Sequence, residues 1–408
     1  MFKKWMLLLF VLPILVGCHL DGNKGMTRSL NRVAKAEYQA FNDEDYLSRL
    51  NAFSSNLYPL VKEENNYAYS PLSIYFAFSL LHFVGDQNVK DEVEEFMGMT
   101  SSDIEKSGSL FKSLNKEVYW ENKLISRLQL TNSIWLDSEA SYHQEPLDEM
   151  AEKYYTWAFS TPFASNNKKA NNDIRKFIAK YTQGLIDKDF DLNPDTIMAL
   201  INTLYIKDVW SVNADLSEKP GIFYGKQKEK ETSFLYGNYV SGVCQETDVS
   251  EYFYTRTSQG YRLKFILPRE GYTLDEAMSA PNLYVVNSNT DYGDTASNRT
   301  RCIFPKFKIT CDTPLKDILQ DNNYLNQTFT SFKSNIVDDD LFVSDIKHST
   351  ILNVNEKGVE GAAVTIIAAA KSSIEVVKNH DFLIDRPFGF VLTSPNNVVL
   401  FAGQVTDI

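Results

Sequence analysis

Runs of apolar residues divide this chain into helical and extended segments. From Asp43 to Leu60 apolar side chains recur every three to four residues, which predicts an amphipathic helix packed along one face. Ser70 precedes Pro71 and a nearly all-apolar stretch, so it can cap a buried helix that begins at Pro71. The same spacing predicts further helices over residues 90–97, 104–114, 123–128, 147–157 and 171–184.

Extended segments dominate the second half of the chain. The most apolar strand-like run is TIMALINTLYIKDVW, residues 196–210. Further strands are predicted over residues 129–136, 261–268, 301–311 and 348–354, and a closing hairpin over residues 386–392 and 398–405. No repeat, low-complexity run or linker interrupts residues 43–408, so we expect a single α+β domain.

The segment from Gly361 to Ala370 combines the composition of a strand with the flanks of a loop. It contains only Gly, Ala, Val, Thr and Ile, whereas turn residues precede it and Lys371-Ser372-Ser373 follow it. Uncharged, proline-free segments of this kind are ordinarily kept off exposed sheet edges. We therefore expect an exposed loop in one state and a strand in another. The alternative is a buried strand followed by a linker of small residues.

Two motifs resemble the serpin family. Residues 356–365, EKGVEGAAVT, resemble the hinge of an inhibitory serpin reactive-centre loop, and residues 66–74, NYAYSPLSI, resemble the serpin "shutter" motif beneath the main sheet. The resemblance covers nearly all of the mature chain in order. It departs over residues 322–336, and at Val359 and Gly361, where Thr or Ser and Ala are more usual.

The resemblance implies the serpin fold and a set of site residues. The fold is a single α+β domain with a large central, mostly antiparallel sheet, two smaller sheets, about eight or nine helices and an exposed reactive-centre loop over residues 356–378. The implied hinge comprises Glu356, Gly358, Val359, Glu360, Gly361, Ala362, Ala363, Val364 and Thr365. The implied shutter and breach residues are Asn66, Ser70, Pro71, Ser73, Asn202, Trp210 and His348. A buried Asn202 needs hydrogen-bond partners, for which Ser70 and His348 are candidates.

Four residues are candidates for the reactive bond: Ala370, Lys371, Ser372 and Ser373. Counting from Glu356 as is common in the family places the cut after Ser372. Lys371 would suit a trypsin-like protease, and Ala370 or Ser372 an elastase-like one.

By this resemblance the protein is a suicide-substrate inhibitor of serine proteases, and also of some cysteine proteases, rather than an enzyme. It would trap the acyl-enzyme by inserting the cleaved loop into the main sheet, so its target proteases are covalent partners of a monomer. Alternate residues of the inserted strand would face the core, and all are apolar or small: Val359, Gly361, Ala363, Thr365, Ile367 and Ala369. One alternative is a non-inhibitory serpin that acts as a carrier. Another is a surface hydrolase, against which the absence of a Gly-x-Ser-x-Gly motif argues.

Charge and cysteine content limit the kinds of partner, metal site and disulfide that we expect. The net charge is −12 and no Lys/Arg-rich run occurs, so a nucleic-acid partner is not expected. No Cys-x-x-Cys or His-Glu-x-x-His motif occurs, so we expect neither metal nor cofactor. Cys302 and Cys311 would lie about 30 Å apart on one straight strand, too far to form a disulfide.

The N-terminus carries an export signal. Lys3 and Lys4 precede an apolar stretch over residues 5–16 that is too short to span a bilayer, which indicates a signal peptide. Residues 15–18, LVGC, resemble the bacterial lipobox, in which Cys18 is acylated and becomes the first mature residue; the alternative is an ordinary secretory signal. We expect a signal peptide (1–17), a lipidated N-terminus and polar tether (18–42) and a serpin domain (43–408). Such a lipoprotein would be exported and anchored through its lipid in a bacterial envelope membrane, at the outer membrane or cell surface.

Overall fold

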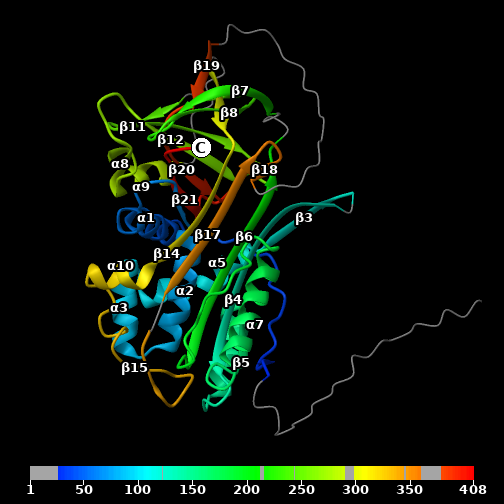
Figure 1. Ribbon diagram of the computed structural model, residues 1–408, viewed down its shortest axis with the longest axis vertical. Helices are drawn as coiled ribbons and strands as arrows, with labels where there is room; N and C mark the ends of the chain where they lie inside the picture. The colour runs from blue at the N-terminus through cyan, green and yellow to red at the C-terminus, as the bar shows by residue number, and fades with distance from the viewer. Residues whose placement is uncertain are drawn as a thin grey trace, which may run out of the picture.

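Figure 1 shows a computed structural model of the chain, described over residues 26–121, 123–211, 216–242, 244–289, 298–343, 346–359 and 378–408. A large sheet, sheet A, runs along the long axis of the molecule, and two smaller sheets lie at its upper end (Figure 1). The strand order of sheet A is β1-β5-β4-β6-β18-β17-β14, and β3 pairs with β4. All of these pairs are antiparallel except β4 with β5.

The strands of sheet A are β1 (Arg28–Ser29), β3 (Lys116–Trp120), β4 (Lys123–Asp137), β5 (Thr156–Thr161), β6 (Met198–Val209), β14 (Phe307–Pro314), β17 (Lys347–Asn355) and β18 (Gly358–Val359). Sheet B comprises β2 (Tyr67–Tyr69), β10 (Gln245–Glu246), β11 (Ser250–Arg256), β12 (Arg262–Pro268), β20 (Phe388–Thr393) and β21 (Val399–Val405). Sheet C comprises β7 (Ser217–Tyr224), β8 (Glu229–Tyr236), β9 (Val240–Ser241), β13 (Asn298–Pro305) and β19 (Lys378–Leu383), and β15 (Phe332–Lys333) pairs with β16 (Asp340–Leu341).

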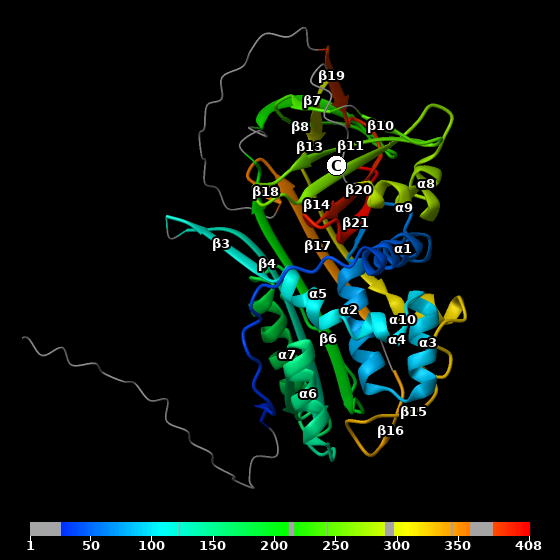
Figure 2. The ribbon, with the colours of Figure 1, turned by 180° about the vertical axis from the view of Figure 1, so that it is seen from behind.

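The helices gather mainly behind sheet A (Figure 2). They are α1 (Glu44–Val61), α2 (Pro71–Val84), α3 (Gln87–Met97), α4 (Ser101–Ile104), α5 (Ser107–Leu114), α6 (Gln144–Tyr154), α7 (Asn167–Tyr181), α8 (Leu274–Ala277), α9 (Ala280–Ser288) and α10 (Leu315–Asp321). No helix in the described ranges is both long and apolar enough to cross a bilayer.

Helix α2 is the central helix of the core. Pro71 occupies its first turn, and the Ser70 hydroxyl accepts a hydrogen bond from the Ser73 backbone N–H at 3.2 Å, as the sequence predicts. The helix is apolar around most of its circumference and packs against β6 and β21. It therefore forms the floor beneath sheet A.

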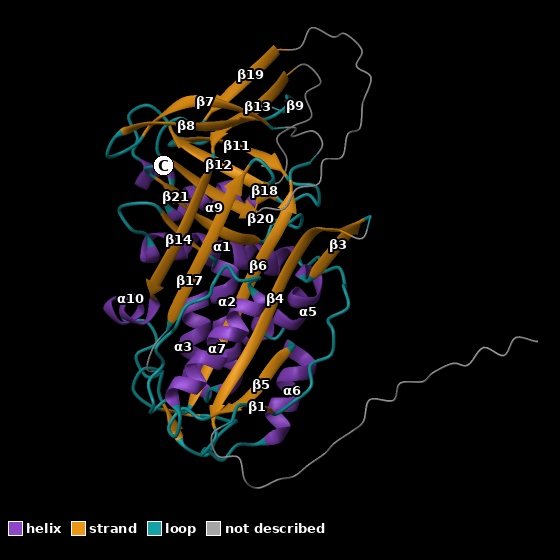
Figure 3. Ribbon diagram, turned by 45° about the vertical axis from the view of Figure 1, so that its right-hand side comes forward, coloured by secondary structure: helices purple, strands orange, loops and turns teal. Residues whose placement is uncertain are grey.

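Helix α7 packs on the opposite face of sheet A. It is amphipathic, and Ala170, Ile174 and Ile178 join Trp135 and Phe163 in a small separate apolar cluster. Sheet A is therefore a layer between α2 and α7, and its long strands β4, β6, β17 and β14 lie side by side in Figure 3.

Two sequence-based assignments are wrong. Residues 123–128, expected as a helix, form the first part of β4, because pairing with β3 on one side and β6 on the other outweighs local propensity. Residues 301–311, expected as one strand, divide between β13 of sheet C and β14 of sheet A after Pro305. Cys244, Cys302 and Cys311 are free thiols, and Cys302 and Cys311 lie on strands of two different sheets rather than on one straight strand.

Candidate functional site

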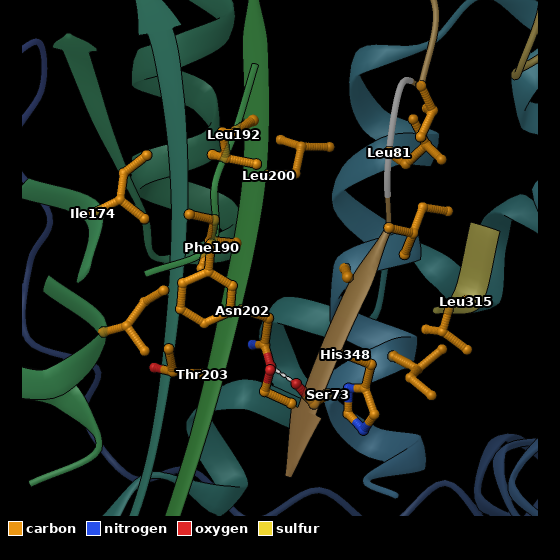
Figure 4. Close-up of a pocket in the computed structure, with 18 of the residues that line it drawn as sticks. Ser73, Leu81, Ile174, Phe190, Leu192, Leu200, Asn202, Thr203, Leu315 and His348 are labelled. Carbon is orange, nitrogen blue, oxygen red and sulfur yellow. Dashed lines mark hydrogen bonds between the residues drawn. The ribbon is translucent and has the colours of Figure 1, made fainter. Parts of the chain in front are cut away.

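A gap between β6 and β17 marks the candidate site. Among the described residues, Met198–Lys207 of β6 pair only with β4, and the lower part of β17 pairs only with β14. Between them lies a cavity of about 250 Å³, which we call the slot. Ser73 and Leu81 line its floor, Leu200 and His348 its sides, and Ile174 its outer face (Figure 4). Backbone N–H and C=O groups of two strands thus face a gap one strand wide.

The first residues of the predicted hinge occupy the upper end of the slot. β18 pairs with both neighbours: Gly358 lies opposite Val209 and Asn355, and Val359 opposite Asp208 and Val354. Val359 has 0% of its surface exposed, so its side chain faces the core as the strand alternation predicts.

Gly358 is required at its position. Its φ is +149°, a conformation that side chains rarely adopt, and an added Cβ would lie 2.0 Å from the Asp208 carbonyl oxygen. The preceding Glu356 lies at the turn, where its carboxylate is 3.7 Å from the Lys306 ammonium. The hinge thus enters the sheet through a position that only glycine fits.

The strands meet around Trp210 at the top of the slot, the breach. The Trp210 indole N–H donates to the Asn355 carbonyl oxygen at 2.8 Å and tethers the end of β17. Beside it, the Asp208 carboxylate accepts from the Ser258 hydroxyl at 2.7 Å and the Gln259 N–H at 2.9 Å, and burial raises the pKa of Asp208. Asp208 was missed at the sequence level, where it is one polar residue in an apolar run.

The floor of the slot carries the shutter network. The Ser73 hydroxyl donates to Asn202 Oδ1 at 2.6 Å, and Asn202 Nδ2 donates to Asn132 Oδ1 at 2.8 Å. The predicted partners of Asn202, Ser70 and His348, are therefore wrong. They bind each other instead, because the Ser70 N–H donates to His348 Nε2 at 2.9 Å. Asn132 was missed, although an Asn in an apolar strand is a signal for a buried network.

Asn66 does not belong to this network. Its amide binds the C-terminal segment: Nδ2 donates to the Asp407 carbonyl oxygen at 2.6 Å and Oδ1 accepts from the Thr406 N–H at 2.7 Å. The structure thus brings Ser70, Pro71, Ser73, Asn202 and His348 together, with Trp210 at the other end of the slot.

The predicted hinge residues Glu360–Thr365, the candidates for the reactive bond Ala370, Lys371, Ser372 and Ser373, and the lipidation candidate Cys18 lie outside the described residues. Within the described ranges no group of His, Cys, Asp or Glu side chains is arranged to hold a metal ion.

A connector from α7 to β6 crosses the slot on its outer side. Leu192 is fixed to α7 by Asn171, whose amide accepts from the Leu192 N–H at 2.8 Å and donates to its carbonyl oxygen at 3.0 Å. Earlier in the connector, the Lys188 ammonium forms an ion pair with Asp312 on β14, on the far side of β17. Asp312 also accepts from the Ser349 hydroxyl of β17 at 2.8 Å. The connector is therefore held at α7 by Asn171 and at β14 by the Lys188–Asp312 ion pair, so that it lies across the slot.

His348 predicts a pH-dependent stability. Burial disfavours the charged imidazolium and lowers the pKa of His348 to about 4, against a smaller opposing effect of the Asp312 carboxylate. The unfolded state binds this proton near pH 6.5, so stability is lost as pH falls from about 6.5 to 4, by roughly 2–3 kcal/mol. Thermal unfolding at pH 7 and pH 4.5 should show a smaller loss of Tm for His348→Gln than for the wild type. Equal losses would contradict this account.

Comparison with known proteins places the chain in a family. A family model described as Serpin (serine protease inhibitor) matches residues 48–408. Iripin-1 of Ixodes ricinus is 25% identical over 413 residues, covering 98% of each chain. The fold is similar to that of tengpin, a thermophilic serpin, in its native state (TM-score 0.76, 22% identity, 92% of this chain and 98% of that one). It is also similar to thyroxine-binding globulin in complex with thyroxine (TM-score 0.72, 24% identity, 88% and 99%). The gap beside a buried hinge and the match over most of the chain lead to one conclusion: the protein belongs to the serpin family.

Proposed function

We propose that this protein is a suicide-substrate inhibitor of serine proteases, and of some cysteine proteases, rather than an enzyme. The observation that carries the proposal is the slot in sheet A with Val359, the start of the loop, already paired at its upper end. A strand continuing from Val359 would run antiparallel to both β6 and β17, the arrangement that the two open edges require.

The proposed reaction begins as ordinary proteolysis. The serine hydroxyl or cysteine thiol of the protease attacks the carbonyl carbon of the reactive bond, the amine of the next residue leaves with a proton, and an ester or thioester joins the loop to the enzyme. Water would normally hydrolyse this bond. Here the freed upstream segment inserts into the slot first and draws the attached enzyme along sheet A.

The register of β18 fixes where each loop residue would lie. Continued downward, it places Ala363 opposite Leu204 and Thr365 between Asn202 and His348. The inward face would then receive the small or apolar residues Gly361, Ala363, Thr365, Ile367 and Ala369. Thr365 alone among them carries a hydroxyl, and it would face the shutter amide of Asn202.

The length of the slot agrees with the predicted reactive bond. The same register places Ala369 opposite Met198, the first residue of β6. The ten residues between Val359 and Ala370 span about 33 Å as a strand. Cleavage after Ala370, Lys371, Ser372 or Ser373 would therefore leave enough chain to fill the slot and bring the ester to its lower end.

Incubation with trypsin and elastase tests the proposed function. We expect an adduct that survives SDS with each enzyme, because Lys371 suits the first and Ala370 or Ser372 the second. Mass analysis should find different C-terminal peptides with the two enzymes, and one common peptide would contradict dual specificity. Cleavage without adduct or gain in thermal stability would favour a non-inhibitory carrier, for which the likeness to thyroxine-binding globulin is the only support.

The proposal includes an envelope location. Acylation of Cys18 would anchor an exported bacterial protein to a membrane through lipid chains, without a spanning helix. We expect the wild-type protein to partition into a detergent phase and the Cys18→Ala variant to remain in the aqueous phase.

The Lys188–Asp312 ion pair predicts a change in loop insertion. Insertion requires the connector to move away from the slot. Lys188→Met removes the ion pair with Asp312, one of the interactions that hold the connector in place. Both side chains are partly exposed, so the pair contributes at most about 1 kcal/mol and the rate should rise by no more than about fivefold. Loss of trapping activity during storage at elevated temperature measures spontaneous insertion. Lys169→Met, which breaks the ion pair with Asp173 within α7, is the matched control and should show no acceleration.

A further inference from the structure

The N-terminal arm, residues 26–31, contains β1 (Arg28–Ser29), which is the edge strand of sheet A. Arg28 pairs with Ser160 and Ser29 with Phe159 of β5, and the Leu30 N–H donates to the Ala158 carbonyl oxygen at 2.8 Å. The sequence predicts only a polar tether here, because two paired residues leave no alternation to detect.

Asn31 fastens the arm to two elements at once. Its Oδ1 accepts from the Ala158 N–H at 2.9 Å, and its Nδ2 donates to the carbonyl oxygens of Thr156 and Leu147, each at 3.0 Å. The side chain is buried, and its amide completes the free edge of β5 while binding α6. The arm is therefore held in place on the protein.

The register across sheet A places this arm beside the lower end of the slot. Arg28 pairs with Ser160, Ser160 with Leu136, and Leu136 with Met198, so these four residues form one row across the sheet. At about 4.8 Å per strand, Arg28 lies some 14 Å from Met198 and some 19 Å from a strand inserted beside it. Figure 3 shows β1 next to β5 at this lower end, opposite the end that carries sheets B and C.

We propose that the N-terminal arm is a contact surface for the captured protease. The inference rests on the proposed function, since it assumes that loop insertion carries the ester-linked protease to the lower end of the slot. A protease domain of about 220 residues has a radius of gyration near 17 Å, hence a diameter of roughly 44 Å. Its radius of roughly 22 Å exceeds the separation of about 19 Å, so an enzyme attached there is large enough to contact the arm. Met26 on the arm is 54% exposed, and Phe342, in the segment that lines the other side of the slot's lower end, is 59% exposed. Two exposed apolar side chains thus lie on either side of the position that the captured protease would occupy.

The arm also relates the captured enzyme to the proposed lipid anchor. Nine residues lie between Cys18 and Arg28, and the ten steps from one to the other reach at most about 35 Å when extended. The anchored end and the trapped protease therefore share one end of the molecule, and the enzyme is brought against the membrane surface.

Photo-cross-linking tests this contact in the full mature protein. The photoreactive residue p-benzoylphenylalanine is placed at Met26 in one variant and at Arg28 in another. If one variant fails to fold, the contact can still be tested with the other. The matched control carries it at Asn379, an exposed residue at the start of β19 that directly follows the loop. Each protein is illuminated with active protease, which forms the adduct, and with a protease whose nucleophilic Ser is replaced by Ala, which only docks.

We expect Met26 and Arg28 to cross-link to the protease in the adduct alone, and Asn379 to cross-link to the docked inactive enzyme alone. An adduct that forms normally with no cross-link from either arm position overturns the contact and leaves the proposed function intact. The absence of any adduct overturns the proposed function, and the contact with it.

Discussion

Replacing Ala363 by aspartate is expected to abolish protease capture while leaving cleavage of the loop intact. The register places residue 363 opposite Leu204 on the face toward α2, where a carboxylate would be buried without a partner. Such burial costs several kcal/mol, and 3 kcal/mol slows a step by more than 100-fold. Hydrolysis of the acyl-enzyme would then precede insertion. The fraction of protease in the SDS-stable adduct should fall by at least tenfold, with a matching rise in cleaved inhibitor.

The neighbouring substitution Ala362→Asp is the matched control. The continued register would place residue 362 opposite Tyr205, on the face of the sheet that Glu360 would also take. With the same charge one residue away, the fraction of protease in the SDS-stable adduct should be clearly larger than for Ala363→Asp. Equal yields for the two variants, or an undiminished yield for Ala363→Asp, would show that strand insertion does not decide capture.

Cleavage of the loop without capture is expected to raise the Tm by about 10 °C or more. Ten inserted residues form up to about twenty backbone hydrogen bonds with the open edges of β6 and β17, each worth roughly 1 kcal/mol, and the cost of ordering the segment offsets about half. A net gain of about 10 kcal/mol corresponds to roughly 12 °C for a domain of this size.

Differential scanning calorimetry before and after nicking by a protease that is not trapped measures this gain. The nicked Ala363→Asp variant should gain much less, because its segment stays outside the sheet. A nicked wild type that melts at the temperature of the intact protein would mean that the slot does not accept the loop.

The sequence predicts most of the elements that build the site and few of their contacts. The cap at Ser70, the long apolar strand through Asn202 and the turn at Gly358 follow from local chemistry and are confirmed. The partners of Asn202 do not follow, because Asn132 and Ser73 reach it from segments 70 and 129 residues away.

The Lys188–Asp312 ion pair and the pairing of the arm with β5 could not be predicted either. Each joins an exposed segment of ordinary polar composition to a strand more than 120 residues distant, and nothing in the local pattern specifies such a pairing. The assignment of residues 123–128 to a helix failed for the same reason, since their strand is determined by its neighbours.

The burial of Val359 bears on how fast the proposed loop insertion would occur. When a free segment joins a sheet, its first contact costs conformational entropy that only the later contacts offset. Helix nucleation and loop closure carry the same kind of cost. Here that first contact exists before the protease arrives, since Gly358 and Val359 are already hydrogen-bonded to both flanking strands. The proposed insertion would therefore proceed by propagation without a nucleation delay, because each residue that joins the sheet would position the next.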